Sequence, residues 1–470
     1  MTLAKKLSHT AAPVSAAAHI VSLEDRRAAG KALRDTVPRE WHGGWKEFKG
    51  RPSPVDILRK SDTGRMKELV PIRYGRMLQS PFAFYRGSAG LMASDLAQTP
   101  NTGLQVQACG DCHLMNFGGF ATPERNVIFD INDFDETSPA PWEWDVKRLV
   151  ASMVLAARSI GLSDSQGRDC AETAARSYRE HMREFSKMDP LRVWYTNISA
   201  EDIIGIVPKA VQKRMKKRIR KVTSGTGSEL DFPKLAGTIA GQTRITDQPP
   251  LIFHPEDVHA PETWAEIEKV LHAYRETLAD DRRMLLDRYR LVDVAIKVVG
   301  VGSVGRLCSI VLLMSEANDP LFLQCKEAGE SVLEPYAGKS VYRHPGQRVV
   351  MGQRLMQPAS DIFLGWVTGR KGQALYVRQL RDAKIKPLVE TFDAEVLDIY
   401  GVMCGWVLAR AHAKVSELSA TISGYLGSSS DEFDKAMGRF ALAYADQAEH
   451  DYAILKSAVR KGKITIYEET

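Results

Sequence analysis

Residues 109–136 read CGDCHLMNFGGFATPERNVIFDINDFDE, and this stretch gathers most of the chemistry visible in the chain. The apolar run 127–129 predicts a buried strand, because short apolar runs bounded by turn residues favour strands. Acids packed this densely repel one another unless a cation lies among them. Mg²⁺ suits them, since it takes oxygen ligands from one or two carboxylates and leaves room for phosphate. The acids that follow the strand are Asp130, Asp133, Asp135 and Glu136.

The spacing within this stretch indicates phosphoryl transfer. That reaction needs an acid to orient the attacking hydroxyl, and an amide plus a carboxylate to hold metal ions. Asp111, Asn116 five residues later, and Asp133 at the strand end supply these groups. Asp130 and Asp135 stay open as alternative metal ligands. A plain Asx-rich turn between two strands is the competing interpretation.

Two other motifs overlap the same stretch. Cys109, Cys112 and His113 fit the C-x-x-C-H pattern of haem attachment, and the cysteine pair alone fits a redox or zinc motif. We expect neither, because no second ligand pair lies nearby and the N-terminal residues are not typical of an export signal. His113 is expected to brace the loop.

Length and composition set wider limits. A chain of 470 residues is longer than one hydrophobic core usually accommodates, so two or three lobes are expected. The net charge of +6 is too small to argue for nucleic acid as a partner. No apolar run approaches the roughly 20 residues that span a bilayer. Six cysteines do not make a disulfide framework, so we expect a cytoplasmic protein without membrane contact. The oligomeric state stays open.

A second informative region begins at residue 291. Gly300, Gly302 and Gly305 form G-x-G-x-x-G, with Ser303 among them. A dinucleotide fingerprint would have to open a helix, but the apolar residues 306–314 predict a strand. We therefore expect a β-hairpin whose glycines cover phosphates, as in a kinase glycine-rich loop. The alternative is a plain hairpin whose glycines serve only sharp bends.

The next strand, 321–325, delivers Lys326, which we expect to contact phosphates. Glu334 follows on a short helical piece and is its expected ion-pair partner, with Glu330 as second choice. Residues 294–297 spell V-A-I-K, a kinase motif, but Lys297 precedes the glycines. Since that motif belongs after the glycine loop, Lys297 is expected to be an exposed bystander.

The remaining pattern predicts an α+β chain in four parts. These are an N-terminal arm with helices (1–100), the catalytic loop, metal-binding strand and helices (101–290), a small β lobe (291–382) and closing helices (383–470). The β lobe is expected to hold five strands, with further ones at 348–356, 362–367 and 375–380. Asp145 stands near the start of a helix at 146–160, and Arg86 is expected in an ion pair or at a phosphate.

The chain resembles the bacterial proteins that carry the domain of unknown function 2252. The resemblance covers most of the chain and rests on residues 69–89, 110–118, 129–149, 319–336, 376–382 and 408–413. More distantly, GDCHLMN (110–116) resembles the H-G-D-x-x-x-x-N loop of aminoglycoside and choline phosphotransferases, and WEWD (142–145) resembles their W-x-D element. This implies Asp111 as base, Asn116 and Asp133 as metal ligands, and Asp145 as a brace. Cys109 stands where that family has histidine.

The order of these motifs differs from that of ordinary kinases. There the glycine loop and lysine precede the catalytic loop, whereas here they follow it, and LARAHA (408–413), which resembles the helix before the catalytic loop, comes last. We therefore expect a circularly permuted, protein-kinase-like fold with two lobes, since nearby surface termini tolerate permutation.

The leading expectation is ATP- and Mg²⁺-dependent phosphotransfer to an unknown hydroxyl. Transfer of AMP instead of phosphate stays open. A metal-dependent hydrolase that uses the acids of 111–136 is one alternative. A catalytically inactive nucleotide-binding module of the pseudokinase type is another.

Overall fold

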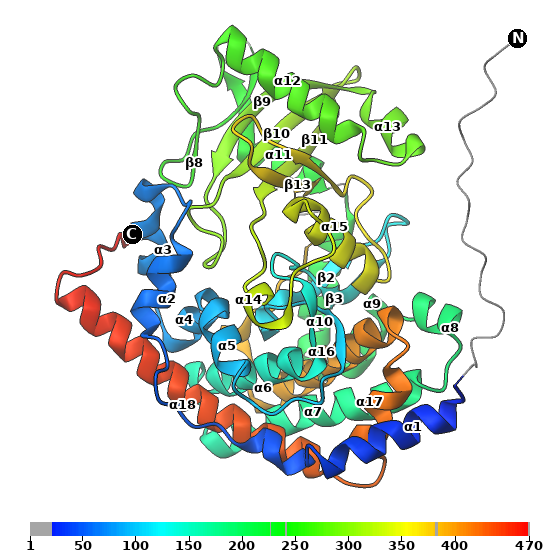
Figure 1. Ribbon diagram of the computed structural model, residues 1–470. Helices are drawn as coiled ribbons and strands as arrows, with labels where there is room; N and C mark the ends of the chain where they lie inside the picture. Colours follow the sequence, from blue (N-terminus) through cyan, green and yellow to red (C-terminus); the bar gives the residue numbers. More distant parts are fainter. Residues whose placement is uncertain (1–20, 226, 240–241, 381–383, 469–470) are drawn as a thin grey trace, which may run out of the picture.

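The computed structural model describes residues 21–468 apart from 226, 240–241 and 381–383 (Figure 1). The arm expected over residues 1–20 lies outside this described part. Figure 1 shows a helical part below and a sheet-containing part above, with the cyan strands β2 and β3 between them. The mixed α+β class expected from the sequence is confirmed.

The helical part is built around α6 (Trp142–Ser159), α7 (Asp164–Phe185) and α16 (Ala394–Val415). Helix α7 begins at a capping box in which the side chains of Ser163 and Gln166 bond reciprocally to the backbone. α16 begins where Asp393 accepts a bond from the Val396 N–H. Nearly every residue of α6 is buried, which makes it the central helix of the largest hydrophobic cluster.

Both ends of the described chain complete this helical part. The N-terminal helices are α1 (Leu23–Ala32), α2 (Pro54–Ser61), α3 (Val70–Met77), α4 (Pro81–Gly87) and α5 (Ala89–Leu96). α1 packs against α17 (Ser419–Leu426), and α2 and α4 pack against α18 (Glu432–Arg460). The buried Arg51 guanidinium joins the two ends, because it donates to both Asp95 and Asp451 at 2.6–2.8 Å. In Figure 1 the blue and red helices accordingly lie side by side.

The upper part is organised by a six-stranded antiparallel sheet with the order β12-β13-β11-β10-β9-β8. One face packs against α12 (Pro261–Arg275) and α13 (Asp280–Leu286) through an apolar cluster around Tyr274 and Leu313. The other face forms a second cluster around Ile310 and Phe322. The strands are β8 (Ile252–Phe253), β9 (Tyr289–Lys297), β10 (Cys308–Ser315), β11 (Pro320–Glu327), β12 (Gly365–Thr368) and β13 (Ala374–Gln379).

Smaller sheets carry the stretch around residue 111. β1 (Gln105–Ala108) pairs with β4 (Ser138–Pro141), and β2 (Phe117–Ala121) pairs with β3 (Val127–Ile131), which also pairs with β5 (Ile198–Ser199). The strand predicted at 127–129 is therefore present. The remaining described elements are α8 (Pro190–Tyr195), α9 (Ala200–Ile206), α10 (Lys209–Thr223), α11 (Gly227–Leu235), β6 (Ala236–Ile239), β7 (Gln242–Ile245), α14 (Glu334–Ala337) and α15 (Pro345–Met356).

Three expectations about the elements are corrected. Residues 348–356, expected as a strand, lie in helix α15, because Pro345 occupies its first turn and the His344 side chain caps it. The sheet has six strands, not five, since β8 joins it from before residue 291. Helices α12 and α13 also belong to this part, so it extends well before the expected boundary.

Across the part of the chain that the structure describes, no helix combines the length and the apolar character that crossing a membrane requires.

Candidate active site

A cavity of about 440 Å³ lies where the two parts of the molecule meet. Its walls come from α2–α4, the loop after β1, the end of β3, the β9–β10 hairpin and strands β11 and β13. The structure thus brings together segments that lie far apart in the sequence. The predicted site residues that line the cavity are Arg86, Asp111, His113, Asn116, Asp133, Asp135, Gly300, Gly302, Ser303 and Lys326.

The loop after β1 is held in place from the helical part. Gly110 has φ +85°, and a side chain there would collide with the Glu136 carbonyl oxygen. The Asp145 carboxylate accepts bonds from the N–H groups of Cys109 (2.7 Å) and Gly110 (3.0 Å). His412 of α16 lies 3.2 Å from the same carboxylate. Asp145 and His412 therefore brace the start of the loop, and neither lines the cavity.

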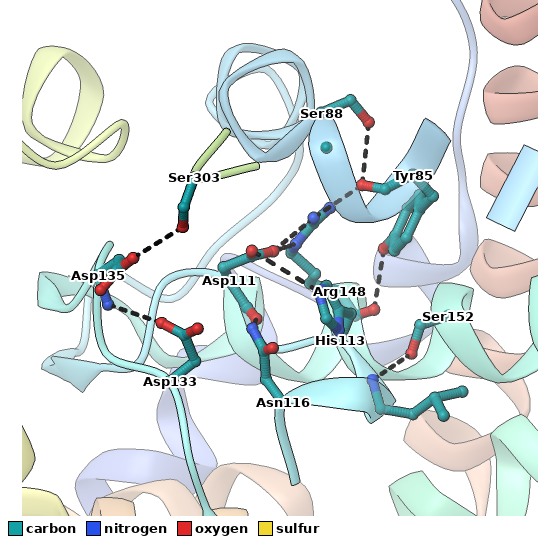
Figure 2. A network of polar contacts seen from close by, with 12 residues as sticks. Tyr85, Ser88, Asp111, His113, Asn116, Asp133, Asp135, Arg148, Ser152 and Ser303 are labelled. Carbon is teal, nitrogen blue, oxygen red and sulfur yellow. Dashed lines mark hydrogen bonds and ion pairs between the residues drawn. The ribbon is translucent and has the colours of Figure 1, made fainter. Parts of the chain in front are cut away.

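Asp111 projects from this loop into the cavity (Figure 2). The Arg148 guanidinium of α6 donates to its Oδ1 at 2.6 Å, and His113 Nε2 lies 3.7 Å from its Oδ2. Burial raises the pKa of Asp111, and Arg148 opposes that shift only in part. Burial also holds the pKa of His113 well below its ordinary value, so His113 is neutral. Asn116 Nδ2 donates to the Asp111 carbonyl oxygen at 2.7 Å, which fixes the turn between them.

Asp133 and Asp135 follow β3 and face the same cavity with different charge environments (Figure 2). Asp135 accepts bonds from Lys326 Nζ (2.6 Å), the Tyr376 hydroxyl (2.5 Å) and the Ser303 hydroxyl (3.2 Å). Burial alone would raise the pKa of Asp135, but Lys326 and Tyr376 outweigh it, so this pKa lies below its usual range. Burial and the neighbouring Asp135 charge raise the pKa of Asp133.

Asp130 takes no part in the cavity. It is fully buried, and the Arg410 guanidinium of α16 donates to its Oδ2 at 2.5 Å. The structure therefore separates the three candidate metal ligands. Asp133 and Asp135 line the cavity, whereas Asp130 joins β3 to α16.

The glycine-rich segment forms the predicted hairpin loop between β9 and β10. Gly300 and Gly305 have φ +71° and +87°, the region that favours glycine. The N-terminal helices hold the loop: Arg76 donates to the Gly300 carbonyl oxygen at 2.5 Å, and Met66 N–H donates to that of Gly305 at 2.8 Å. The Ser303 hydroxyl at the loop tip donates to Asp135, so the tip faces the cavity. Gly305 lies on the side of the loop that the N-terminal segment holds.

Two expectations about lysines and their partners are corrected. Lys326 pairs with Asp135, whereas Glu334 accepts a bond from the Ser331 N–H at 3.1 Å and lies 3.7 Å from Arg348 Nε. Glu334 is the first residue of α14, and its carboxylate faces Arg348 of α15. Lys297 is 7% exposed and lines the same cavity as Lys326, so it is no exposed bystander.

The cavity is rich in cations, and of these the sequence analysis singled out Arg86 and Lys326 as site residues. Burial lowers the pKa of Arg86, and its Nε has no hydrogen-bond partner among the described residues. Arg378 of β13 lies over the Tyr376 ring and donates to Gln324 Oε1 at 3.3 Å. Tyr376 and Arg378 stand in the YVRQLRD motif and Arg148 in WEWDVKRL, so these motifs carried the signal. Further lining cations are Arg65, Arg73, Arg306 and Lys384.

A comparison with protein families places residues 65–458 in one family, which covers the loop around Asp111, the glycine hairpin and α16. Searches of curated proteins and of solved structures return no match. The chain belongs to the family described as uncharacterized protein conserved in bacteria (DUF2252).

Proposed function

We propose that this protein is a Mg²⁺-dependent phosphotransferase that uses ATP and a hydroxyl acceptor, with a circularly permuted kinase-like arrangement of its parts. One observation carries the proposal. Asp111, Asn116, Asp133, Lys326 and the glycine hairpin line a single cavity, although they come from opposite halves of the chain. These are the groups that phosphoryl transfer needs, and their sequence order plays no part in the chemistry.

The donor set fits a hard divalent cation. Asp133 offers a half-buried carboxylate whose negative charge its neighbour Asp135 disfavours, and a cation between them would relieve that repulsion. Asn116 uses its amide N–H on the Asp111 carbonyl oxygen, which leaves its side-chain oxygen as a ligand atom. Carboxylate and amide oxygens are the ligands that Mg²⁺ takes alongside phosphate. Mg²⁺ held there would neutralise charge on the phosphates.

The opposite wall suits the phosphates. Lys326 comes from β11, one strand after the glycine hairpin, and Arg378 of β13 adds a guanidinium group near it. Arg86 of α4 adds a second guanidinium group from the helical side, near Asp111. Arginine matches phosphate oxygens in a planar, bidentate way, whereas lysine acts as a point charge. The Ser303 hydroxyl at the hairpin tip is a further donor. Lys326, Arg378 and Ser303 thus come from the sheet side of the cavity, whereas Arg86 and the acids Asp111 and Asp133 come from the opposite side.

Asp111 is the proposed base that orients the acceptor hydroxyl. Its carboxylate is bound by Arg148 at 2.6 Å, so the acceptor has to share or displace that contact. The same ion pair supports a second candidate function, a nucleotide-binding module without turnover. In that case Arg148 holds Asp111 permanently, and the cavity binds the nucleotide without transferring a phosphate.

The decisive experiment uses the full chain with ATP labelled at the γ- or the α-phosphate, Mg²⁺ and a bacterial metabolite extract as the acceptor source. Label transfer from the γ-position that Asp111→Asn abolishes would support the phosphotransferase. Transfer from the α-position would instead mean AMP transfer. Metal-dependent binding without transfer would select the inactive module. Absence of Mg-ATP binding at millimolar nucleotide would reject both nucleotide proposals and leave the metal-dependent hydrolase.

A further inference from the structure

Two histidines and one aspartate form a compact cluster at the edge of the six-stranded sheet, and none of them lines the active-site cavity. His254 follows β8, His259 lies five residues later, and Asp293 lies within β9. His254 Nε2 is 3.1 Å from Asp293 Oδ2, and His259 Nε2 is 2.9 Å from Asp293 Oδ1. Both rings therefore direct the same nitrogen, Nε2, at one carboxylate.

The other side of His254 is also occupied by a carboxylate. Its Nδ1 lies 2.8 Å from Asp247 Oδ1, which also accepts the His254 backbone N–H at 3.0 Å. Carboxylate oxygens only accept bonds, and a neutral imidazole has a single N–H. A neutral His254 therefore cannot satisfy both contacts. A metal ion on Nε2 resolves this, because Nδ1–H then donates to Asp247, which is the usual arrangement around metal-bound histidine.

The backbone around Asp293 holds its carboxylate rigidly. Its side chain is fully buried and already accepts the N–H groups of Ile245 (2.7 Å) and Val294 (2.9 Å). Those bonds fix the carboxylate so that its oxygens face the two rings. The cluster thus has one rigid anionic ligand and two imidazole ligands, the combination that zinc binds.

We propose that His254, His259 and Asp293 bind a Zn²⁺ ion, with Asp247 as the outer partner that orients His254. The ligand atoms of the three residues lie within 4.8 Å of one another. In a tetrahedral site with metal–ligand bonds of about 2.0–2.2 Å, ligand atoms lie roughly 3.4 Å apart. The present distances of 2.9 and 3.1 Å need only a small separation to admit the ion.

The fourth position of the ion faces solvent. The His259 side chain is 34% exposed, compared with 16% for His254 and none for Asp293. Zn²⁺ bound here would hold a water on the His259 side. It would also tie the segment 247–259 to β9, which ends at the cavity-lining Lys297. The site is therefore a clamp on the strand that leads into the glycine hairpin, and it does not depend on the proposed phosphotransfer.

The test titrates Zn²⁺ into the chelator-treated full-length protein and measures stoichiometry and affinity by competition with a chromophoric chelator. We expect one Zn²⁺ per chain, insensitive to millimolar Mg²⁺, and a rise in the melting temperature. His259→Gln should lose this binding because it removes a ligand nitrogen, and it should keep its fold because the side chain is partly exposed. His272→Gln, an exposed histidine on α12 outside the cluster, is the matched control and should bind as the wild type.

Two further variants make the assignment specific. Asp247→Asn should weaken Zn²⁺ binding by about 10–100-fold, the usual effect of losing an outer partner. Asp133→Asn removes an acid of the active-site cavity and should leave the Zn²⁺ stoichiometry unchanged. Co²⁺ substitution should give the visible absorption of a tetrahedral site in the wild type and not in His259→Gln. Equal Zn²⁺ affinity in the His259→Gln and His272→Gln variants, or no binding by the wild type, would overturn the proposal.

Discussion

The Lys326 ammonium donates to the Asp135 carboxylate at 2.6 Å, although the two residues are 191 positions apart in the chain. Tyr376 donates to the other oxygen of the same carboxylate. Strands β11 and β13 of the sheet are thereby joined to the acidic segment after β3. This contact spans the boundary between the two parts of the molecule, and it occupies the lysine that the proposed reaction assigns to phosphates.

Replacing Lys326 with methionine should affect both stability and binding. Removing one partner of a buried pair leaves an uncompensated charge and typically costs about 3–5 kcal/mol, and Asp135 is only partly screened by solvent. We expect a lower free energy of unfolding in urea and loss of Mg-ATP affinity. The double variant Lys326→Met/Asp135→Asn should regain stability without regaining nucleotide binding. If the double variant binds Mg-ATP normally, Lys326 does not contact the phosphates.

Asp133→Asn should remove nucleotide binding while raising stability, whereas Lys326→Met is expected to lower both. Burial and Asp135 raise the pKa of Asp133 above its unfolded value, so its ionisation opposes folding at neutral pH, and stability rises as pH falls through the folded pKa. The amide variant should therefore melt at a higher temperature than the wild type in EDTA at pH 7. Its stabilisation by Mg-ATP should disappear, which thermal unfolding with and without ligand measures.

The opposite pattern, with Mg-ATP stabilisation intact in Asp133→Asn and lost in Asp135→Asn, would move the metal ligand to Asp135.

Asp111→Asn should remove transfer while leaving Mg-ATP affinity near that of the wild type, because the proposed base acts on the acceptor. The exposed Asp169→Asn on α7 is a matched control for the same chemical change. Nucleotide affinity by titration and label transfer with γ-labelled ATP provide the two readouts. A parallel loss of affinity and transfer would place Asp111 at the nucleotide instead.

The buried Lys147 predicts a pH dependence of stability. Burial lowers its pKa to about 7, and its Nζ donates to Thr99 Oγ1 at 2.8 Å. An unfolded lysine titrates near 10.4, so between about pH 7 and 10 the unfolded chain binds more protons. The free energy of unfolding should then rise with pH, by at most about 2.7 kcal/mol over two pH units.

The measurement for Lys147 compares urea unfolding at pH 7 and pH 9 in the wild type and in Lys147→Met. The cysteine thiols of the unfolded chain titrate over this range in both proteins, so the difference between the two isolates Lys147. The same pH response in both proteins would contradict the assignment.

Much of the local structure could be predicted from the sequence. The strand at 127–131, the antiparallel hairpin around Gly302 and the helix after Asp145 are present, because apolar period and turn residues determine them locally. α15 was missed because its two adjacent valines favour a strand, while the cap at His344 and burial against β13 and α16 favour a helix.

The partners of charged residues could not be predicted in the same way. Lys326 has acids within ten residues, yet its partner Asp135 comes from the other half of the chain. The place of Lys297 before the glycines predicted an exposed side chain, but the N-terminal segment holds the loop that follows it, and Lys297 is buried in the cavity wall. Such pairings depend on how distant segments meet, which the spacing along one segment does not encode.

The ion pair between Asp130 and Arg410 has a consequence for biosynthesis. The two residues are 280 positions apart, so at a ribosomal rate of 5–20 residues per second Asp130 is made roughly 14–56 s before its partner. During that interval the acid on β3 has no arginine from α16, and a nascent chain keeps such a carboxylate in water. Strand β3, which leads to Asp133 and Asp135, therefore cannot reach its final burial until Arg410 has left the ribosome.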